Sequence, residues 1–195
     1  LTSISKDNFI DIGNKISSYP ENLNIHKTLA RIIGNRKKMI SSGEDIEWST
    51  AEALAFGSLL KDGFPVRLVG QDSIRGTFSQ RHSALVDQET EERYIPLNNI
   101  SDNQAKYEGI DSFLSELAVL GYEYGYSLDY PGSLVLWEAQ FGDFENGAQV
   151  QIDQFIEPGE AKWLKRSGVV LLLLQGNDGH VPEQSAASIE RYVQF

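Results

Sequence analysis

Hydrophobic residues along the chain recur at two spacings, one typical of amphipathic helices and one of buried strands. In the first part of the chain, apolar positions recur every three or four residues, and they are Ile25, Leu29, Ile32, Ile33 and Met39. This spacing predicts a helical lead-in over residues 1–47, with Gly43 as a helix stop. A further helix is expected over residues 50–62, with Ser49 or Thr50 as its N-cap.

Three short apolar runs predict strands that are buried on both faces, as in parallel sheets. They are residues 65–70, 133–137 and 168–174, and the last is the clearest buried strand in the pattern. Helical spacing returns over residues 114–127 and 148–156. This alternation of strand and helix predicts an α/β fold, with a parallel sheet and helices on both faces.

The carboxyl ends of parallel strands are where such sheets bind their ligands. The segments that follow Val69, Trp137 and Leu174 are therefore the candidates for a site. Residues 71–109 show the least regular pattern of the chain, with only a short extended piece expected over residues 94–97.

Length and charge narrow the class of protein. A chain of 195 residues fits one domain with its own core, and we expect an α/β domain over residues 48–195 after the lead-in of residues 1–47. The net charge of -11 disfavours binding to nucleic acid or to an anionic membrane surface. The absence of cysteine excludes a disulfide framework, and residues 169–174, the longest apolar run, are too few to cross a bilayer.

The two ends of the chain suggest that it belongs to a longer polypeptide. The first residue, Leu1, is not an initiator methionine, and no basic segment followed by an apolar one comes after it. Residues 188–195 have the pattern of an amphipathic helix that stops without a cap.

Several common catalytic signatures are missing from the sequence. The three histidines, His26, His82 and His180, are too scattered for a zinc site, so we expect no metal bound by this chain. The chain has no Gly-x-Ser-x-Gly elbow, no Gly-x-x-x-x-Gly-Lys loop and no Gly-x-Gly-x-x-Gly turn.

Three stretches nevertheless resemble one family, and the likeness is dense from Trp48 onward. They are residues 70–82 (Gly-Gln-Asp-Ser-Ile-Arg-Gly-Thr-Phe-Ser-Gln-Arg-His), residues 114–126 with Leu-Ser-Glu and Gly-Tyr-Glu-Tyr-Gly-Tyr, and residues 136–156 beginning Leu-Trp-Glu-Ala-Gln-Phe-Gly-Asp-Phe. All are similar to the decarboxylating, thiamine-diphosphate-dependent component of 2-oxoglutarate dehydrogenase or its 2-oxoadipate relative. The resemblance implies the domain that holds the aminopyrimidine ring of the cofactor.

The resemblance assigns the central role to Glu116. It matches the family glutamate that bonds the far ring nitrogen, so that the cofactor's own amino group, in its imino form, removes the C2 proton. A partly buried carboxylate in that position would have a shifted pKa. The alternative is an ordinary glutamate that complements the dipole of a helix N-terminus.

The resemblance also implies cofactor contacts from residues 140–149. Phe144 matches the aromatic that stacks on the aminopyrimidine, and Phe141 would line the same pocket. Gln140 and Gln149 are candidates for amide contacts. For the two phenylalanines the alternative is a role in the core.

Further candidates lie at the expected mouth of the substrate pocket. His82 and Arg75, with Asp72 beside them, shape either this mouth or a subunit contact, and a surface loop is the alternative. After the last strand the family reads two histidines, whereas this chain has Gln175 and Gln184, with His180 between them out of register. A glutamine cannot take up a proton, so this departure puts full activity in doubt.

The resemblance implies partners as well. The family holds the diphosphate and magnesium with a separate domain, whose Gly-Asp-Gly…Asn signature this chain lacks. The expected partners are that diphosphate-binding domain, the dihydrolipoyl acyltransferase component of the complex and a second copy in a homodimer, in the mitochondrial matrix or the bacterial cytoplasm. The expected function is that of a fragment of a 2-oxoacid dehydrogenase, inactive by itself. The alternative is a non-catalytic binding or assembly module.

Overall fold

The computed structural model describes residues 3–173 and 192–193, and its contacts divide the chain into two compact units. The first unit consists of Leu1–Val66 and Ile74–Tyr107, and the second of Arg67–Ser73 and Glu108–Phe195. The residues of the predicted lead-in therefore belong to the same compact unit as residues 48–66 and 74–107. The boundary expected after Glu47 stays a prediction.

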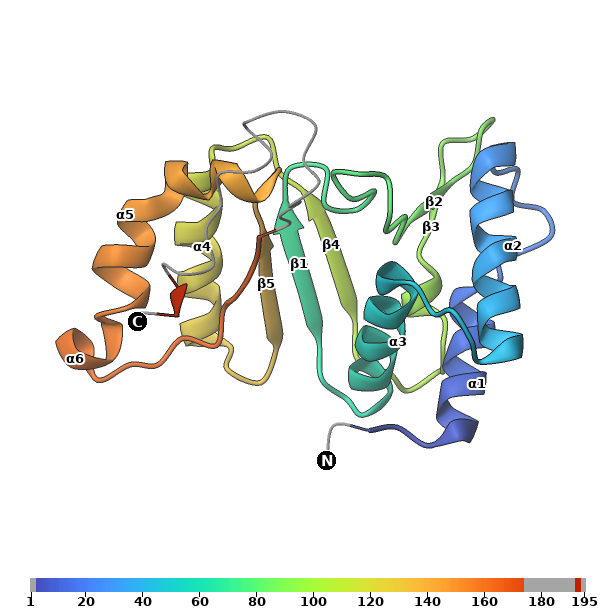
Figure 1. Ribbon diagram of the computed structural model, residues 1–195, viewed down its shortest axis with the longest axis horizontal. Coiled ribbons are helices and arrows are strands. Elements are labelled where there is room, and N and C mark those ends of the chain that lie inside the picture. Colours follow the sequence, from blue (N-terminus) through green and yellow to red (C-terminus); the bar gives the residue numbers. More distant parts are fainter. Residues whose placement is uncertain (1–2, 174–191, 194–195) are drawn as a thin grey trace. The chain divides into compact units, whose positions relative to one another are not determined.

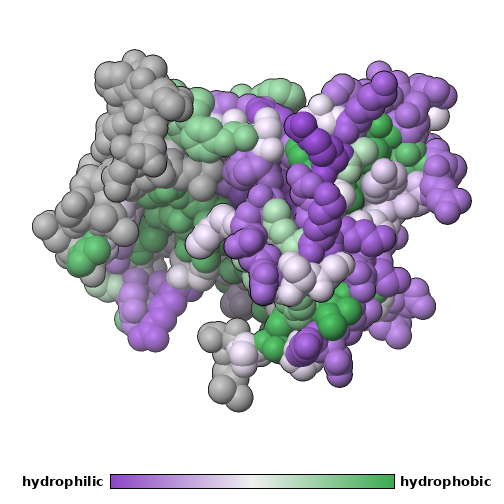
Figure 2. Space-filling view, turned by 45° about the vertical axis from the view of Figure 1, so that its right-hand side comes forward, coloured by the Kyte–Doolittle hydropathy of each residue, from purple (hydrophilic) through white to green (hydrophobic). Residues whose placement is uncertain are grey.

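The first unit is mainly helical (Figure 1). Its elements are α1 (Lys6–Ile16), α2 (Lys27–Ser42), α3 (Trp48–Lys61), the antiparallel strands β2 (Leu85–Val86) and β3 (Arg93–Tyr94), and the 3₁₀ helix η1 (Pro96–Asn98). The sequence prediction is confirmed for α2, which ends at Gly43 in the left-handed region, with its N–H donating to the Met39 carbonyl. Much of the outer surface of this unit is hydrophilic in the view of Figure 2.

The predicted N-cap of the next helix is wrong. The helix α3 begins at Trp48, and its capping residue Glu47 makes no side-chain cap bond. Ser49 and Thr50 lie inside the first turn and are buried. The Thr50 hydroxyl donates to the Met39 sulfur on α2, 3.9 Å away, rather than to a backbone N–H at the helix start.

The second unit contains the sheet, which confirms the predicted α/β class with a parallel sheet flanked by helices (Figure 1). The strands, in spatial order, are β4 (Tyr107–Asp111), β1 (Val66–Gly70), β5 (Leu134–Glu138) and β6 (Val170–Leu172). Between and after them come α4 (Glu116–Asp129), the 3₁₀ helix η2 (Gly142–Ala148), α5 (Gln149–Gln151), the π-helical turn η3 (Ile152–Ile156) and α6 (Gly159–Trp163). The sequence pattern missed β4, since only Tyr107 and Ile110 are apolar in it.

The last strand is less buried than its apolar sequence indicates. Val170 is exposed, and Leu171 and Leu172 are half-buried. The strand β6 pairs in parallel with β5, with Leu171 opposite Trp137, and ends the order of described strands. It therefore lacks a second neighbouring strand among the described residues, which the sequence pattern did not reveal.

The helix expected over residues 148–156 is present over Gln149–Ile156, but it is not regular, because the α-helical turn α5 continues directly as the π-helical turn η3. Pro158 has no N–H to donate to a carbonyl one turn earlier, and the chain widens to a π-turn just before it. The Lys162 ammonium donates to the Gln154 carbonyl at 2.9 Å, which satisfies the acceptor that the proline leaves without a backbone partner.

The core of the second unit lies between the sheet and α4. Its buried members are Val69, Val119, Leu120, Trp137, Ala139, Ala148 and Ile152. A buried ion-pair network ties β1 to α4, because Arg67 donates to both carboxylate oxygens of Glu123, at 2.8 and 3.0 Å. Arg67 also bonds Glu108 at 3.0 Å and lies 4.5 Å from the centre of the Tyr126 ring. A paired, planar guanidinium is the favourable way to bury charge at this position.

Gly70, the last residue of β1, is a position where a side chain has no room. A β-carbon there would overlap the carbonyl oxygen of Glu138 at the end of β5. We expect Gly70→Ala to lower the free energy of unfolding by about 1–3 kcal/mol, because the two strand ends must separate. Gly125→Ala in α4 is the matched control, since nothing lies within 4 Å of its added methyl. It should raise stability by up to about 1 kcal/mol through helix propensity. Urea denaturation of both variants measures the difference, and equal effects would contradict the steric argument.

Candidate functional site

Glu116 and Gln140 meet at the carboxyl ends of the strands. Glu116 is the first residue of α4, and the N-cap of that helix is Ser115, whose hydroxyl accepts from the Ala118 N–H at 3.4 Å. Gln140 follows β5 by two residues, and its backbone N–H donates to Oε1 of Glu116 at 3.1 Å. The predicted start of the helix near Glu116 is thus confirmed, at the edge of the sheet where parallel folds bind ligands.

The second carboxylate oxygen of Glu116 is buried and has no hydrogen-bond partner among the described residues. The side chain as a whole is 8% exposed. Burial raises the pKa of Glu116 above its ordinary value, against the opposing effects of the Gln140 N–H and the Trp137 indole. A buried oxygen with no partner is costly, so this atom calls for an explanation.

Trp137 is a residue of this site that sequence reasoning did not identify. It lies on β5, is fully buried, and its indole N–H, which acts on Glu116, falls short of a full hydrogen bond to any described residue. In the sequence Trp137 reads as one of several apolar residues of a strand. Only the structure shows that its indole lies close enough to act on Glu116.

The Gln140 side chain makes a hydrogen bond within the protein. Its amide nitrogen donates to Oδ2 of Asp72 at 2.7 Å, and Asp72 has a positive φ of 56°. This bond joins the loop after β1 to the loop after β5, within the second unit. The backbone of Gln140 positions Glu116, while its side chain shapes the loop. A direct contact of this amide with the cofactor stays a prediction.

Phe141 and Phe144 lie together, just after the strand end. Their ring centres are 5.8 Å apart in an edge-to-face arrangement with an angle of 71°. Phe141 holds a strained backbone, with φ 50° and ψ 127°, and begins η2. Phe144 is 43% exposed, so part of its ring is available to another flat molecule. The turn η2 packs against α4 near Glu116: a β-carbon built on Gly147 would lie 3.9 Å from the Glu116 β-carbon.

Gln149 begins α5, which also packs on α4. Its amide nitrogen donates to Asp153 at 2.6 Å. Its oxygen is buried and has no partner among the described residues. It offers an acceptor in the same segment, and the predicted cofactor contact stays a prediction.

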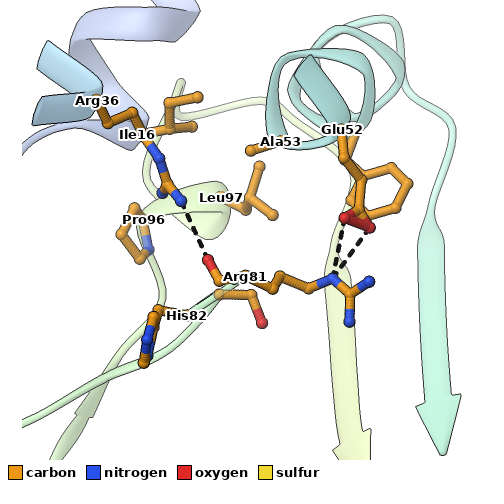
Figure 3. A pocket seen from close by; sticks show the side chains of 10 residues that line it. Ile16, Arg36, Glu52, Ala53, Arg81, His82, Pro96 and Leu97 are labelled. Carbon is orange, nitrogen blue, oxygen red and sulfur yellow. Dashed lines mark hydrogen bonds and ion pairs between the residues drawn. The ribbon is translucent and has the colours of Figure 1, made fainter. Parts of the chain in front are cut away.

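His82 and Arg75 belong to the first unit, whereas Glu116 belongs to the second. Arg75 is exposed and donates to the Ser79 hydroxyl at 2.9 Å, which closes its own loop. His82 has a positive φ of 45° and lines a small cavity (Figure 3). Their role at the substrate mouth stays a prediction. Gln175, His180 and Gln184 lie outside the described residues.

Within residues 3–173 and 192–193, no group of three metal-ligating side chains is found. The same residues contain no helix with the length and apolarity that a bilayer crossing requires. The groups that the site presents are of the kind that a flat, heteroaromatic ligand can contact. A buried carboxylate oxygen can share a proton with a ring nitrogen, and a half-exposed phenylalanine can stack on a ring.

The fold and this site are those of a thiamine-diphosphate-binding α/β domain of the pyrimidine type. The chain belongs to the family described as transketolase, pyrimidine binding domain, which it matches over residues 44–195. It is 58% identical over 194 residues to proteins named 2-oxoglutarate dehydrogenase E1 component from Brucella anthropi, Brucella ovis and Brucella canis. The whole chain is covered in each match, but it spans only 19% of the length of these relatives.

Glu116→Gln should stabilise the chain at neutral pH. The raised folded-state pKa means that the protonated acid is favoured in the fold, so the carboxylate weakens the fold as pH rises above about 4.5. Glutamine keeps an acceptor for the Gln140 N–H and carries no charge. We expect a gain of roughly 1 kcal/mol at pH 7 that fades below pH 4, measured by thermal unfolding across pH.

The control for this prediction is Glu160→Gln. Glu160 is exposed and paired with Arg166 at 2.6 Å, and the hydrogen bond from Arg166 lowers its pKa. Its replacement should therefore bring no gain at neutral pH. A gain of the same size in both variants would show that net charge, rather than burial of Glu116, is responsible.

Proposed function

We propose that this chain supplies the aminopyrimidine half of a thiamine diphosphate site in a 2-oxoacid dehydrogenase. One observation carries the proposal: the buried, partnerless Oε2 of Glu116 at the carboxyl end of the sheet, in a family that binds this cofactor. When bound, the cofactor supplies the nucleophilic carbon that attacks the 2-oxoacid. The chain itself binds and orients the ring.

Each residue of the site has a distinct part in this proposal. Glu116 holds the ring nitrogen through Oε2, and burial, which raises the pKa of Glu116, favours a proton shared between that oxygen and the ring. The backbone N–H of Gln140 fixes the other oxygen, so the carboxylate presents one defined atom to the ring. Phe144 offers a ring face for stacking, with Phe141 packed edge-on behind it. Trp137, fully buried, keeps water from the floor of the site.

The proposed substrate and partners rest on the name of the relatives. The relatives are 2-oxoglutarate dehydrogenase E1 components, so 2-oxoglutarate is our proposed substrate. We further propose that a diphosphate-binding domain with magnesium completes the site, that the assembly is a homodimer, and that it works with a dihydrolipoyl acyltransferase in a multienzyme complex. Because these relatives are bacterial, we favour the bacterial cytoplasm over the mitochondrial matrix.

A second candidate is a non-catalytic module that keeps the fold and works by association. It rests on Gln175 and Gln184, where the resemblance leads one to expect histidines. We expect the double change Gln175→His and Gln184→His to raise 2-oxoglutarate decarboxylation by about 10²–10⁴-fold, in a polypeptide that also carries the diphosphate-binding domain. No gain in a steady-state assay would favour the module.

Binding of the ring to this chain can be followed by NMR. The sequence has three tryptophans, of which Trp137 is buried at the site while Trp48 and Trp163 are exposed. At millimolar thiamine, which lacks the diphosphate, we expect the Trp137 indole and the Gln140 amide signals to shift. The Trp48 and Trp163 indoles serve as internal references and should stay in place.

The controls separate the ring from the diphosphate. Glu116→Gln should weaken the thiamine-induced shifts about tenfold or more, since a bond to a charged partner is lost, whereas Glu160→Gln should leave them unchanged. Thiamine diphosphate with magnesium should bind about as weakly as thiamine, because the diphosphate anchor lies elsewhere. Unchanged affinity in Glu116→Gln, or much tighter binding of the diphosphate form, would contradict the proposal.

A further inference from the structure

The first unit contains a small cavity with two arginines in its wall (Figure 3). Arg36 reaches it from α2, Glu52 and Ala53 from α3, and Arg81 and His82 from the loop before β2. The polar Ser83 also lines it, with its hydroxyl bonded to the Ile74 carbonyl and the Tyr107 hydroxyl, and the other lining side chains are the apolar Ile16, Phe56, Pro96 and Leu97. The cavity has room for one body of about the size of a water molecule.

Arg36 is the unusual member of this wall. Its side chain is 3% exposed, and its Nη2 donates to the backbone carbonyl of Arg81 at 3.1 Å. Its Nε is buried and has no hydrogen-bond partner among the described residues. No described carboxylate forms an ion pair with it. Burial lowers the pKa of Arg36, and the carboxylates of Glu47 and Glu52 oppose this only from a greater distance.

The carboxylates nearest to Arg36 do not bond its guanidinium. Glu52 accepts two hydrogen bonds from Nε of Arg81, at 3.0 Å each, and Glu47 acts on Arg36 only as a charge beyond ion-pair distance. Burial lowers the pKa of His82, and the nearby Arg36 and Arg75 lower it further, so His82 adds no negative partner and stays neutral at pH 7. Among the described residues, no carboxylate therefore lies within ion-pair distance of the Arg36 guanidinium, whose Nε has no hydrogen-bond partner there.

We propose that this cavity binds a small monovalent anion, such as chloride, against the buried Nε of Arg36. An uncompensated buried charge is costly unless an opposite charge meets it, and a water molecule would supply a hydrogen-bond acceptor without that charge. The small volume excludes phosphate and sulfate and selects a single atom or a very small ion. The site lies in the first unit and is independent of the cofactor proposal.

Thermal unfolding of the chain in matched salts tests the anion. Chloride is the probe, and gluconate of the same ionic strength is the reference, because gluconate is too large for the cavity. We expect the melting temperature to be higher in chloride by about 2 °C or more, and to rise with its concentration. Equal melting temperatures in the two salts would overturn the proposal and leave water as the occupant.

Two variants separate this site from general salt effects. Ala53→Val fills the cavity without changing any charge, and it should abolish the chloride dependence while circular dichroism shows an intact fold. Gly34→Ala, also in the first unit, has nothing within 4 Å of the added methyl and should keep the full dependence. A chloride effect that persists in Ala53→Val would place the anion elsewhere on the surface and refute the site.

Discussion

The candidate site of the second unit is centred on one carboxylate, that of Glu116, held between a helix start and a strand end. The Ser115 cap sets where α4 begins, and the Gln140 N–H clamps one oxygen of Glu116 at 3.1 Å. The clamp leaves the other oxygen buried and without a hydrogen-bond partner in the described part of the chain, which is unfavourable for folding by itself. The proposed bond to a ring nitrogen would remove this unfavourable contribution.

The sheet supplies the rigidity that this clamp needs. Gly70 lets the ends of β1 and β5 approach so closely that no β-carbon fits between them. Arg67 then fixes α4 to β1 through two bonds to the buried Glu123, seven residues beyond Glu116 on the same helix. Because both ends of the clamp rest on fixed elements, the carboxylate is positioned before any ligand arrives.

The two units treat buried charge differently. In the second, the cation of Arg67 meets two carboxylates and an aromatic face. In the first, Arg36 is more deeply buried, and its only hydrogen bond among the described residues is to the Arg81 carbonyl. Arg67 shows the pairing of an arginine whose partners are carboxylates of the same chain, Glu108 and Glu123, and Arg36 departs from that pairing. The incomplete pairing of Arg36 thus points to a partner from solution.

The sequence by itself determined the α/β class, the helix that ends at Gly43, the start of a helix near Glu116 and the family resemblance. These follow from periodicity, from glycine's freedom at positive φ and from the order of letters in a motif, all of which are local. Only the tertiary structure decided that Trp137 faces Glu116, that Gln140 divides its bonds between Glu116 and Asp72, and that α3 begins at Trp48. These features depend on which distant segments pack together, and burial by such neighbours changes a residue's role without changing the local pattern of the sequence.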